Sequence, residues 1–214
     1  MPQVLQQLSD SMAAIVEHVR LSLVQLHNGR RGMGAGTVWQ ADGLVVTNAH
    51  VVRHRALQAT LPDGRTVPAQ LVATDTDHDL AVLYVAATGL PAITPAEPST
   101  LQPGHWVLAL GHPWGVAGAV TAGVVIGVGA SPATAWAERA QLNGRASPDA
   151  PHSQGEWIHV SVHLRPGHSG GPLVDAHGHV IGINTMMAGP DVGLAVPVVV
   201  VQGFLRRVRA SQGR

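Results

Sequence analysis

Residues 34–52 read GAGTVWQADGLVVTNAHVV, two runs of strand-forming residues joined by Ala41-Asp42-Gly43. An Asp-Gly turn between such runs predicts a β-hairpin. Similar runs lie on both sides of it, separated by turn residues at intervals of roughly 8 to 12 residues. They are LSLVQLH, ALQATL, TVPAQLVAT, DLAVLYV, WVLALG, VTAGVVIGVG, EWIHVSV, GPLVD, HVIGINT and VGLAVPV. This spacing is typical of antiparallel sandwiches and barrels, so the sequence predicts an all-β fold.

The composition excludes several classes of protein. Of the 214 residues, 45% are hydrophobic and 12% are charged, which is too apolar for a disordered chain. Lys+Arg and Asp+Glu both number 13, so no net charge attracts nucleic acid and we expect no nucleic-acid partner. The chain contains no Cys, which excludes disulfide frameworks, zinc ribbons and thiol nucleophiles.

Both ends of the chain have helical patterns. Apolar residues recur at helical spacing between residues 4 and 19, without the basic and continuous apolar regions of a signal peptide. Pro197 precedes VVVVQGFLRRVRA, which has Arg residues near its end, as expected of a closing helix. The chain has no run of 18 apolar residues, so we expect no membrane span.

The segment Gly167-His168-Ser169-Gly170-Gly171-Pro172 has the pattern G-x-S-x-G. In α/β-hydrolases this pattern forms a nucleophile elbow between a strand and a helix. Here Pro172 begins PLVDAHGHVIGINT, a strand-turn-strand pattern, which disfavours an esterase of that fold. The glycines beside Ser169 let backbone N–H groups converge near its hydroxyl, as acyl transfer requires.

A nucleophilic hydroxyl needs a base and a group that orients the base. His50 follows the predicted strand LVVTN, and Asp79 precedes the predicted strand LAVLYV. The ends of strands are positions from which a rigid scaffold presents side chains to a cleft. The order His, Asp, Ser is that of the chymotrypsin-type triad.

At these residues the chain resembles the trypsin-like serine proteases, and most closely their HtrA/DegP branch. The motifs that carry the resemblance are GAGTVWQADGLVVTNAHVV, DTDHDLAVLYV, LALGHPWG with VTAGVVIGVG, RPGHSGGPLVDAHGHVIGINT and VGLAVPV. The resemblance implies two six-stranded antiparallel β-barrels of the chymotrypsin-like kind, with the active site between them and short N- and C-terminal helices. It implies that His50 is the general base, Asp79 orients it and Ser169 is the nucleophile. Gly167, His168 and Ser169 would form the oxyanion hole, and no metal or other cofactor is needed.

This resemblance predicts a single trypsin-like domain over residues 1–214. We expect an N-terminal helix at 1–20, a first barrel at 21–95, a second barrel at 96–197 with a long loop at 130–155, and a C-terminal helix at 198–214. The loop is longer than the corresponding activity-gating loop of the family, so we expect a flexible segment and a site of self-cleavage. No PDZ domain follows in the sequence, and His168 occupies a position where the family usually has Asn or Asp.

The residues before Ser169 bear on specificity. Enzymes of this class that select Lys or Arg carry an Asp six residues before the serine, where this chain has His163. A cationic P1 side chain would therefore lack a partner. With Leu164 and Leu194 lining it, the substrate pocket is predicted to prefer small to medium aliphatic residues.

The sequence also contains patterns that would point to functions other than a protease. His50 and His54 are spaced as in a zinc protease, but Val51 stands where that motif needs a Glu. His177 and His179 offer only two ligands, which makes a weak metal site. The unusual His168 leaves open a catalytically impaired relative that binds peptides as a chaperone.

The resemblance also bears on partners and location. It implies unfolded or misfolded polypeptides as substrates, in protein quality control. Family members often form trimers through the N-terminal segment, so residues 4–19 could assemble a homotrimer, although the same apolar stripe would serve equally to cover a barrel. If Met1 is the native start, the chain is cytoplasmic; otherwise it is extracytoplasmic, as is usual in the family.

Overall fold

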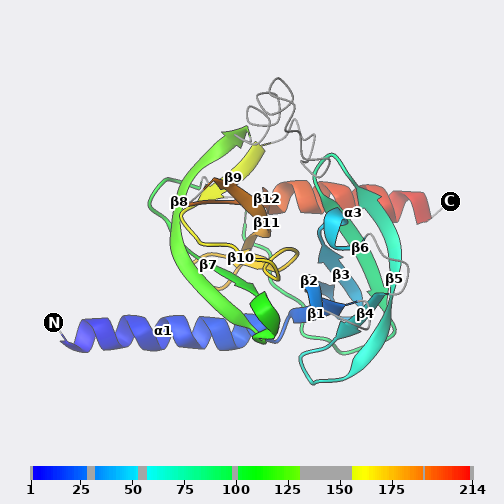
Figure 1. The fold of residues 1–214 in the computed structure, drawn as a ribbon, viewed down its shortest axis with the longest axis horizontal. Coiled ribbons are helices and arrows are strands. Elements are labelled where there is room, and N and C mark those ends of the chain that lie inside the picture. The colour runs from blue at the N-terminus through cyan, green and yellow to red at the C-terminus, as the bar shows by residue number, and fades with distance from the viewer. Residues whose placement is uncertain are drawn as a thin grey trace.

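The hairpin at residues 34–52 belongs to the first of two closed barrels (Figure 1). The computed structural model describes residues 2–27, 32–52, 57–97, 101–130, 156–189 and 191–212. The strands of the first barrel are β1 (Leu23–His27), β2 (Gly32–Gln40), β3 (Leu44–Thr47), β4 (Leu57–Thr60), β5 (Thr66–Asp75) and β6 (Leu80–Val85). They close in the order β1-β2-β3-β6-β5-β4, and every neighbouring pair is antiparallel.

The second barrel has the same number of strands. They are β7 (Trp106–Gly111), β8 (Ala119–Ala130), β9 (Glu156–Val160), β10 (Pro172–Val174), β11 (Val180–Gly189) and β12 (Val192–Pro197). They close in the order β10-β11-β12-β9-β8-β7, again with antiparallel neighbours. The predicted fold, two six-stranded antiparallel barrels with a helix at each end, is confirmed. The predicted flexible loop, apart from Ala130 itself, lies outside the described residues.

Alternation along the strands divides the apolar residues between different cores. Successive side chains of a strand point to opposite faces. Val45 and Leu83 therefore pack inside the first barrel, whereas their neighbours Val46 and Val82 join a cluster that also contains residues of the second barrel and its following helix. A third cluster fills the second barrel. The shared cluster joins the two barrels, so groups from both have fixed positions along the line where they meet.

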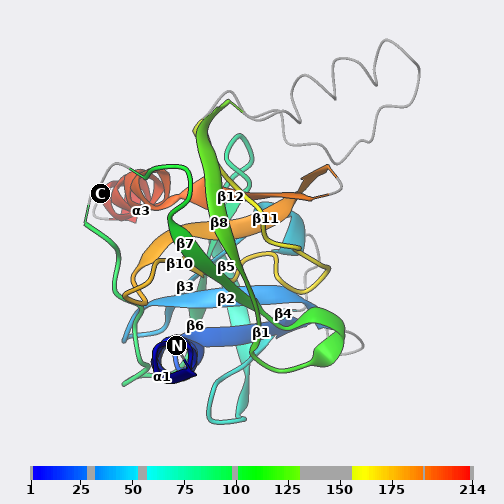
Figure 2. The same cartoon turned by 90° about the vertical axis from the view of Figure 1, so that its left-hand side faces the viewer.

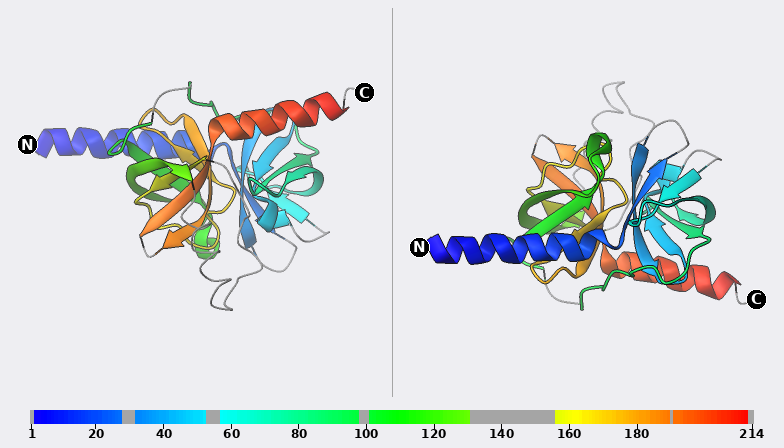
Figure 3. Two further views of the ribbon diagram at one scale, coloured as in Figure 1. Left: turned by 90° about the horizontal axis from the view of Figure 1, so that it is seen from above. Right: turned by 90° about the horizontal axis from the view of Figure 1, so that it is seen from below.

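The N-terminal helix α1 (Pro2–Arg20) leaves the barrels as a rod (Figures 1 and 3). Val19 is buried and Ile15 packs against the shared cluster. Val4, Leu5 and Leu8, at the outer end of the same stripe, are 67%, 68% and 52% exposed. The helix thus packs on the body only through its second half.

The C-terminal helix α3 (Val198–Gln212) begins directly after β12 of the second barrel. It runs across to the first barrel, where it lies beside β5 and β6 (Figures 1 and 3). Val201, Phe204 and Val208 are its buried face. Seen end-on in Figure 2, α1 and α3 lie on separate edges of the molecule. Neither of these two described helices is long and apolar enough to cross a bilayer.

Candidate active site

His50 is held on a short 3-10 turn, Ala49–Val52, that follows β3. Val51 and Val52 are buried and anchor the turn in the first barrel. Asn48, completely buried, donates its side-chain amide to the carbonyl of Asp79 at 2.9 Å. The segment that carries His50 is thereby tied to the hairpin that carries Asp79.

Asp79 lies at the end of the β5–β6 hairpin loop and is 5% exposed. Its Oδ2 lies 2.7 Å from His50 Nδ1, and its Oδ1 accepts the His50 backbone N–H at 3.0 Å. Both carboxylate oxygens therefore orient one histidine. Its backbone has φ 52, a left-handed conformation that is unfavourable for most non-glycine residues but that Asp tolerates better than others. Local strain of this kind persists where neighbouring contacts hold the residue, as Asn48 does here.

Thr185, on β11 of the second barrel, is a further member of the site that the sequence analysis missed. Its hydroxyl donates to Asp79 Oδ2 at 2.5 Å, and it is 3% exposed. A charge-assisted hydrogen bond of this kind is among the stronger ones in proteins. No sequence motif near Thr185 predicts this hydrogen bond, because the contact depends on how one barrel packs against the other.

Ser169 lies on the loop before β10 and is anchored to the first barrel, because its carbonyl accepts the Ala35 N–H at 2.8 Å. Its hydroxyl donates to the Thr185 carbonyl at 2.8 Å. Among the described residues no hydrogen bond joins this hydroxyl to His50. The structure therefore pairs His50 with Asp79 directly and connects Ser169 to them through Thr185.

The turn before Ser169 has the form that an oxyanion hole needs. The His168 N–H donates to the Arg165 carbonyl at 2.9 Å, which closes a β-turn with Pro166 and Gly167 at its centre. Gly167 has φ +108, the conformation a type II turn requires at this position, and a Cβ there would lie 2.5 Å from the His112 carbonyl oxygen. The backbone N–H groups of Gly167 and Ser169 bond to no described residue, so they are free to donate to an oxyanion. The amide of His168, predicted to share this role, is occupied by the turn itself.

The His168 ring is buried beneath this turn at 3% exposure. Its Nδ1 lies 3.1 Å from the Arg165 nitrogen and 3.2 Å from the Arg165 oxygen. Burial lowers the pKa of His168, since it penalises the charged ring. The His112 backbone N–H donates to the Gly167 carbonyl of this turn at 2.8 Å. The pKa of His112 is lowered more strongly, to about 4, by burial together with the nearby charges of Arg20 and His168. Neutral rings are therefore favoured under the oxyanion turn.

An exposed aromatic ring lies beside the same turn. Trp114 is 72% exposed and has φ 53. The Arg165 guanidinium lies 4.8 Å from the centre of its ring, within range of a cation–π interaction. This contact joins the loop after β7 to the first residue of the oxyanion turn.

The three predicted pocket residues have different surroundings. His163 is exposed, whereas Leu164 is buried in the core of the second barrel. The Leu164 side chain packs against Gly193, where an added Cβ would come within 3.2 Å of it. Leu194 is fully buried in the cluster shared by the two barrels. The two leucines that were predicted to line one substrate pocket therefore lie in different hydrophobic clusters.

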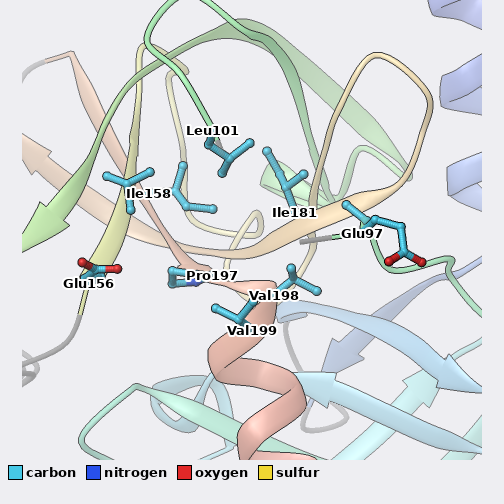
Figure 4. Close-up of a pocket in the computed structure, with 10 residues that line it drawn as sticks. Glu97, Leu101, Glu156, Ile158, Ile181, Pro197, Val198 and Val199 are labelled. Carbon is cyan, nitrogen blue, oxygen red and sulfur yellow. The ribbon is translucent and has the colours of Figure 1, made fainter. Parts of the chain in front are cut away.

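A separate pocket of about 260 Å³ lies at the start of α3. Figure 4 shows its lining, mostly apolar, with Glu97 and Glu156 near its edges. None of the described residues that line it belongs to the triad or the oxyanion turn.

The histidines considered as metal ligands form no such site where the structure describes them. His177 and His179 stack at 6.0 Å between ring centroids, and the carboxylate of Asp175 caps their turn by accepting both backbone N–H groups. Over the described ranges, no group of three potential ligands could hold a metal ion. His54 lies outside the described residues.

The two closed barrels define a chymotrypsin-like fold. One barrel carries the His–Asp pair, and the other carries a serine beside backbone amides that bond to none of the described residues, which is a serine-protease type of site. The model of the trypsin-like peptidase domain family matches residues 34–183, and the chain belongs to this family.

Relatives of this chain include HtrA-type proteases. The chain is 37% identical over 177 residues to the mitochondrial serine protease HTRA2 of Drosophila pseudoobscura pseudoobscura, which covers 81% of this chain and 38% of that protein. It is 34% identical over 175 residues to the putative serine protease HhoB of Synechocystis, covering 80% of this chain and 39% of that protein. The chain thus spans about two fifths of the length of these curated relatives.

Solved structures agree with this assignment. The HtrA-type protease AlgW, determined with a tripeptide, superimposes with a TM-score of 0.77 at 29% identity, covering 92% of this chain and 62% of that one. The serine endoprotease from Yersinia pestis gives a TM-score of 0.73 at 26% identity, covering 91% of this chain and 65% of that one. The predicted resemblance to HtrA-type trypsin-like proteases is confirmed.

Proposed function

We propose that this protein is a serine endopeptidase that hydrolyses peptide bonds in unfolded polypeptides through an acyl-enzyme. The observation that carries the proposal is the pairing of His50 Nδ1 with Asp79 Oδ2 at 2.7 Å. Thr185 links this pair to Ser169, and the backbone N–H groups of Ser169 and Gly167 bond to no residue that the structure describes. The pairing leaves His50 Nε2 as the ring nitrogen that can accept a proton.

In the proposed reaction, the Ser169 hydroxyl turns from the Thr185 carbonyl toward His50 and attacks the scissile carbonyl. His50 takes the hydroxyl proton and then protonates the leaving amine, so that an ester forms at Ser169. Water attacks this ester with His50 again as the base, which releases the acid product and restores the serine. Asp79 holds the ring orientation and stabilises the imidazolium in each half-reaction.

The oxyanion of each tetrahedral intermediate would lie between the N–H groups of Gly167 and Ser169. Donors that are already fixed by a turn stabilise such a charge without reorganisation. This arrangement requires no metal or organic cofactor.

The proposed substrates are polypeptide chains in extended form. AlgW has been determined with a tripeptide and with a decapeptide, which supports a peptide ligand for the same fold. An aliphatic P1 side chain is proposed because Leu164 is apolar and no acidic residue stands at position 163. A homotrimer through α1 is proposed because Val4, Leu5 and Leu8 form an exposed apolar stripe.

Labelling with a biotinylated fluorophosphonate tests this function. Wild-type protein is expected to be labelled and to cleave casein, whereas Ser169→Ala should do neither. Equal cleavage by both proteins contradicts the proposed nucleophile. A folded wild type that is neither labelled nor active would instead favour the peptide-binding module without catalysis.

A further inference from the structure

Helix α3 packs against both barrels. It starts at Val198, immediately after β12, and its buried face packs in the cluster shared by both barrels. In Figure 1 its second half lies against the barrel that contains β5 and β6. The polar edge of this half therefore lies near the hairpin that ends in Asp79.

The contact between α3 and this hairpin is made by one carboxylate. Arg207 Nη2 donates to Asp75 Oδ2 at 2.7 Å, across 132 positions of the sequence. Both oxygens of the same carboxylate lie 3.0 Å from His78 Nδ1, and Oδ1 also accepts the His78 backbone N–H at 3.2 Å. The Asp75 side chain is 12% exposed, whereas that of Arg207 is 62% exposed. Arg207 and His78 are the two charged or titratable side chains that pair with Asp75 among the described residues.

These contacts hold the short connection on which Asp79 depends. Asp75 is the last residue of β5 and pairs with Leu80 across the hairpin, so only Thr76 to Asp79 separate the two strands. Within that connection the Asp79 N–H reaches the Thr76 carbonyl at 3.4 Å, a long hydrogen bond. The connection must hold Asp79 at φ 52, and its own backbone contacts are weak. The side chains around Asp75 supply additional restraint.

We propose that Arg207 and Asp75 are positioning residues for Asp79: the ion pair fixes the β5–β6 connection from α3 and so sets the geometry of the His50–Asp79 hydrogen bond. The inference rests on the proposed function, because it assigns Arg207 a part in building the proposed triad. Arg207 does not touch the reacting atoms.

Catalysis is a more sensitive measure of this role than stability. The Arg207 end of the ion pair is exposed to solvent, so the loss of the pair should barely change the melting temperature. A small displacement of a group in a catalytic constellation lowers the rate far more than it lowers stability. A purely structural ion pair would show neither a kinetic nor a spectroscopic effect on His50.

The test compares Arg207→Gln with Arg206→Gln, which removes the same charge from an exposed residue of the same helix. For Arg207→Gln we expect kcat about tenfold lower and KM nearly unchanged. Arg207→Lys keeps the charge and should restore most of kcat. Arg206→Gln should behave as the wild type.

A second readout does not require turnover. An imidazole N–H bonded to a carboxylate gives a low-field proton NMR signal, which can be recorded in the Ser169→Ala background; its loss in His50→Ala assigns it to His50. Arg207→Gln should broaden or shift this signal, whereas Arg206→Gln should leave it in place. Circular dichroism and the melting temperature show whether each variant is folded.

The outcomes separate the two proposals. An unchanged His50 signal in folded Arg207→Gln overturns the positioning role, even where Ser169→Ala abolishes proteolysis as expected. Proteolysis that survives Ser169→Ala overturns the proposed triad, while the NMR comparison still decides whether Arg207 controls the His50–Asp79 pair. If Arg207→Gln unfolds, Asp75→Asn provides the same comparison, with Arg207→Lys as the variant expected to keep the signal; a wild-type signal in folded Asp75→Asn contradicts the inference.

Discussion

The hydroxyl of Thr185 and the carboxylate of Asp79 form a hydrogen bond of 2.5 Å between the two barrels. The oxygen that accepts it, Oδ2, is also the one that faces His50 Nδ1. The second barrel therefore contributes to the orientation of the His–Asp pair as well as supplying the proposed nucleophile.

Replacing Thr185 with Val should remove this bond while keeping the shape of the side chain. A hydrogen bond to a charged group contributes about 1.5–3 kcal/mol, which corresponds to a loss in kcat/KM of roughly 10- to 100-fold. Thr185→Ser retains the hydroxyl and should stay close to the wild type. Peptide hydrolysis measured for the three proteins checks this, and a fully active Thr185→Val would show that the bond has no part in catalysis.

Gly167 should not accept any side chain. A Cβ there would lie 2.5 Å from the His112 carbonyl oxygen, in a backbone with φ +108. Gly167→Ala must shift the turn, and losing one oxyanion donor typically costs about 100- to 1,000-fold in kcat. Gly127→Ala is the control, because its Cβ would meet nothing within 4 Å and its φ is not positive. Similar kcat values for both variants would place the oxyanion hole elsewhere.

The protein should lose stability as the pH falls from 6.5 toward 4. The pKa of His112 is lowered from 6.5 to about 4 in the folded chain, so between these values the unfolded chain binds more protons. The free energy of unfolding is therefore unaffected by this histidine above pH 6.5. It decreases on acidification through this range, by about 3 kcal/mol for a shift of this size. Burial lowers the pKa of His168 as well, which acts in the same direction.

Urea unfolding of the Ser169→Ala protein at pH 7 and pH 4.5 measures this loss. His112→Asn should reduce the difference between the two conditions, whereas His177→Asn, at an exposed site, should not. The same difference in all three proteins would show that other groups cause the acid sensitivity.

Substituting Asp for His163 should change the P1 preference. The position is exposed and lies six residues before Ser169, where Lys- and Arg-selective enzymes of this class carry Asp. His163→Asp is therefore expected to gain cleavage after Lys and Arg, while His163→Asn retains the aliphatic preference. Profiling a mixed peptide library with both variants decides this; no gain for His163→Asp would place position 163 outside the pocket.

Local patterns predicted the all-β fold and placed His50 and Asp79 at strand ends, and the resemblance to trypsin-like proteases added the two barrels and the pairing of these two residues. Turn residues and strand periodicity mark each hairpin, and both residues lie at strand ends that the alternation defines. The contacts of Thr185 and Arg207 were not predictable, because each bonds to a residue more than 100 positions away. The direction of the Ser169 hydroxyl is a rotamer choice that no sequence pattern encodes.

Helix α3 is the last element of the described chain to be synthesised. A nascent chain that ends before Arg207 already contains His50, Asp79 and Ser169, but not the side chain that binds Asp75. If Arg207 fixes the hairpin of Asp79 as proposed, full proteolytic power appears only after the ribosome has completed this helix.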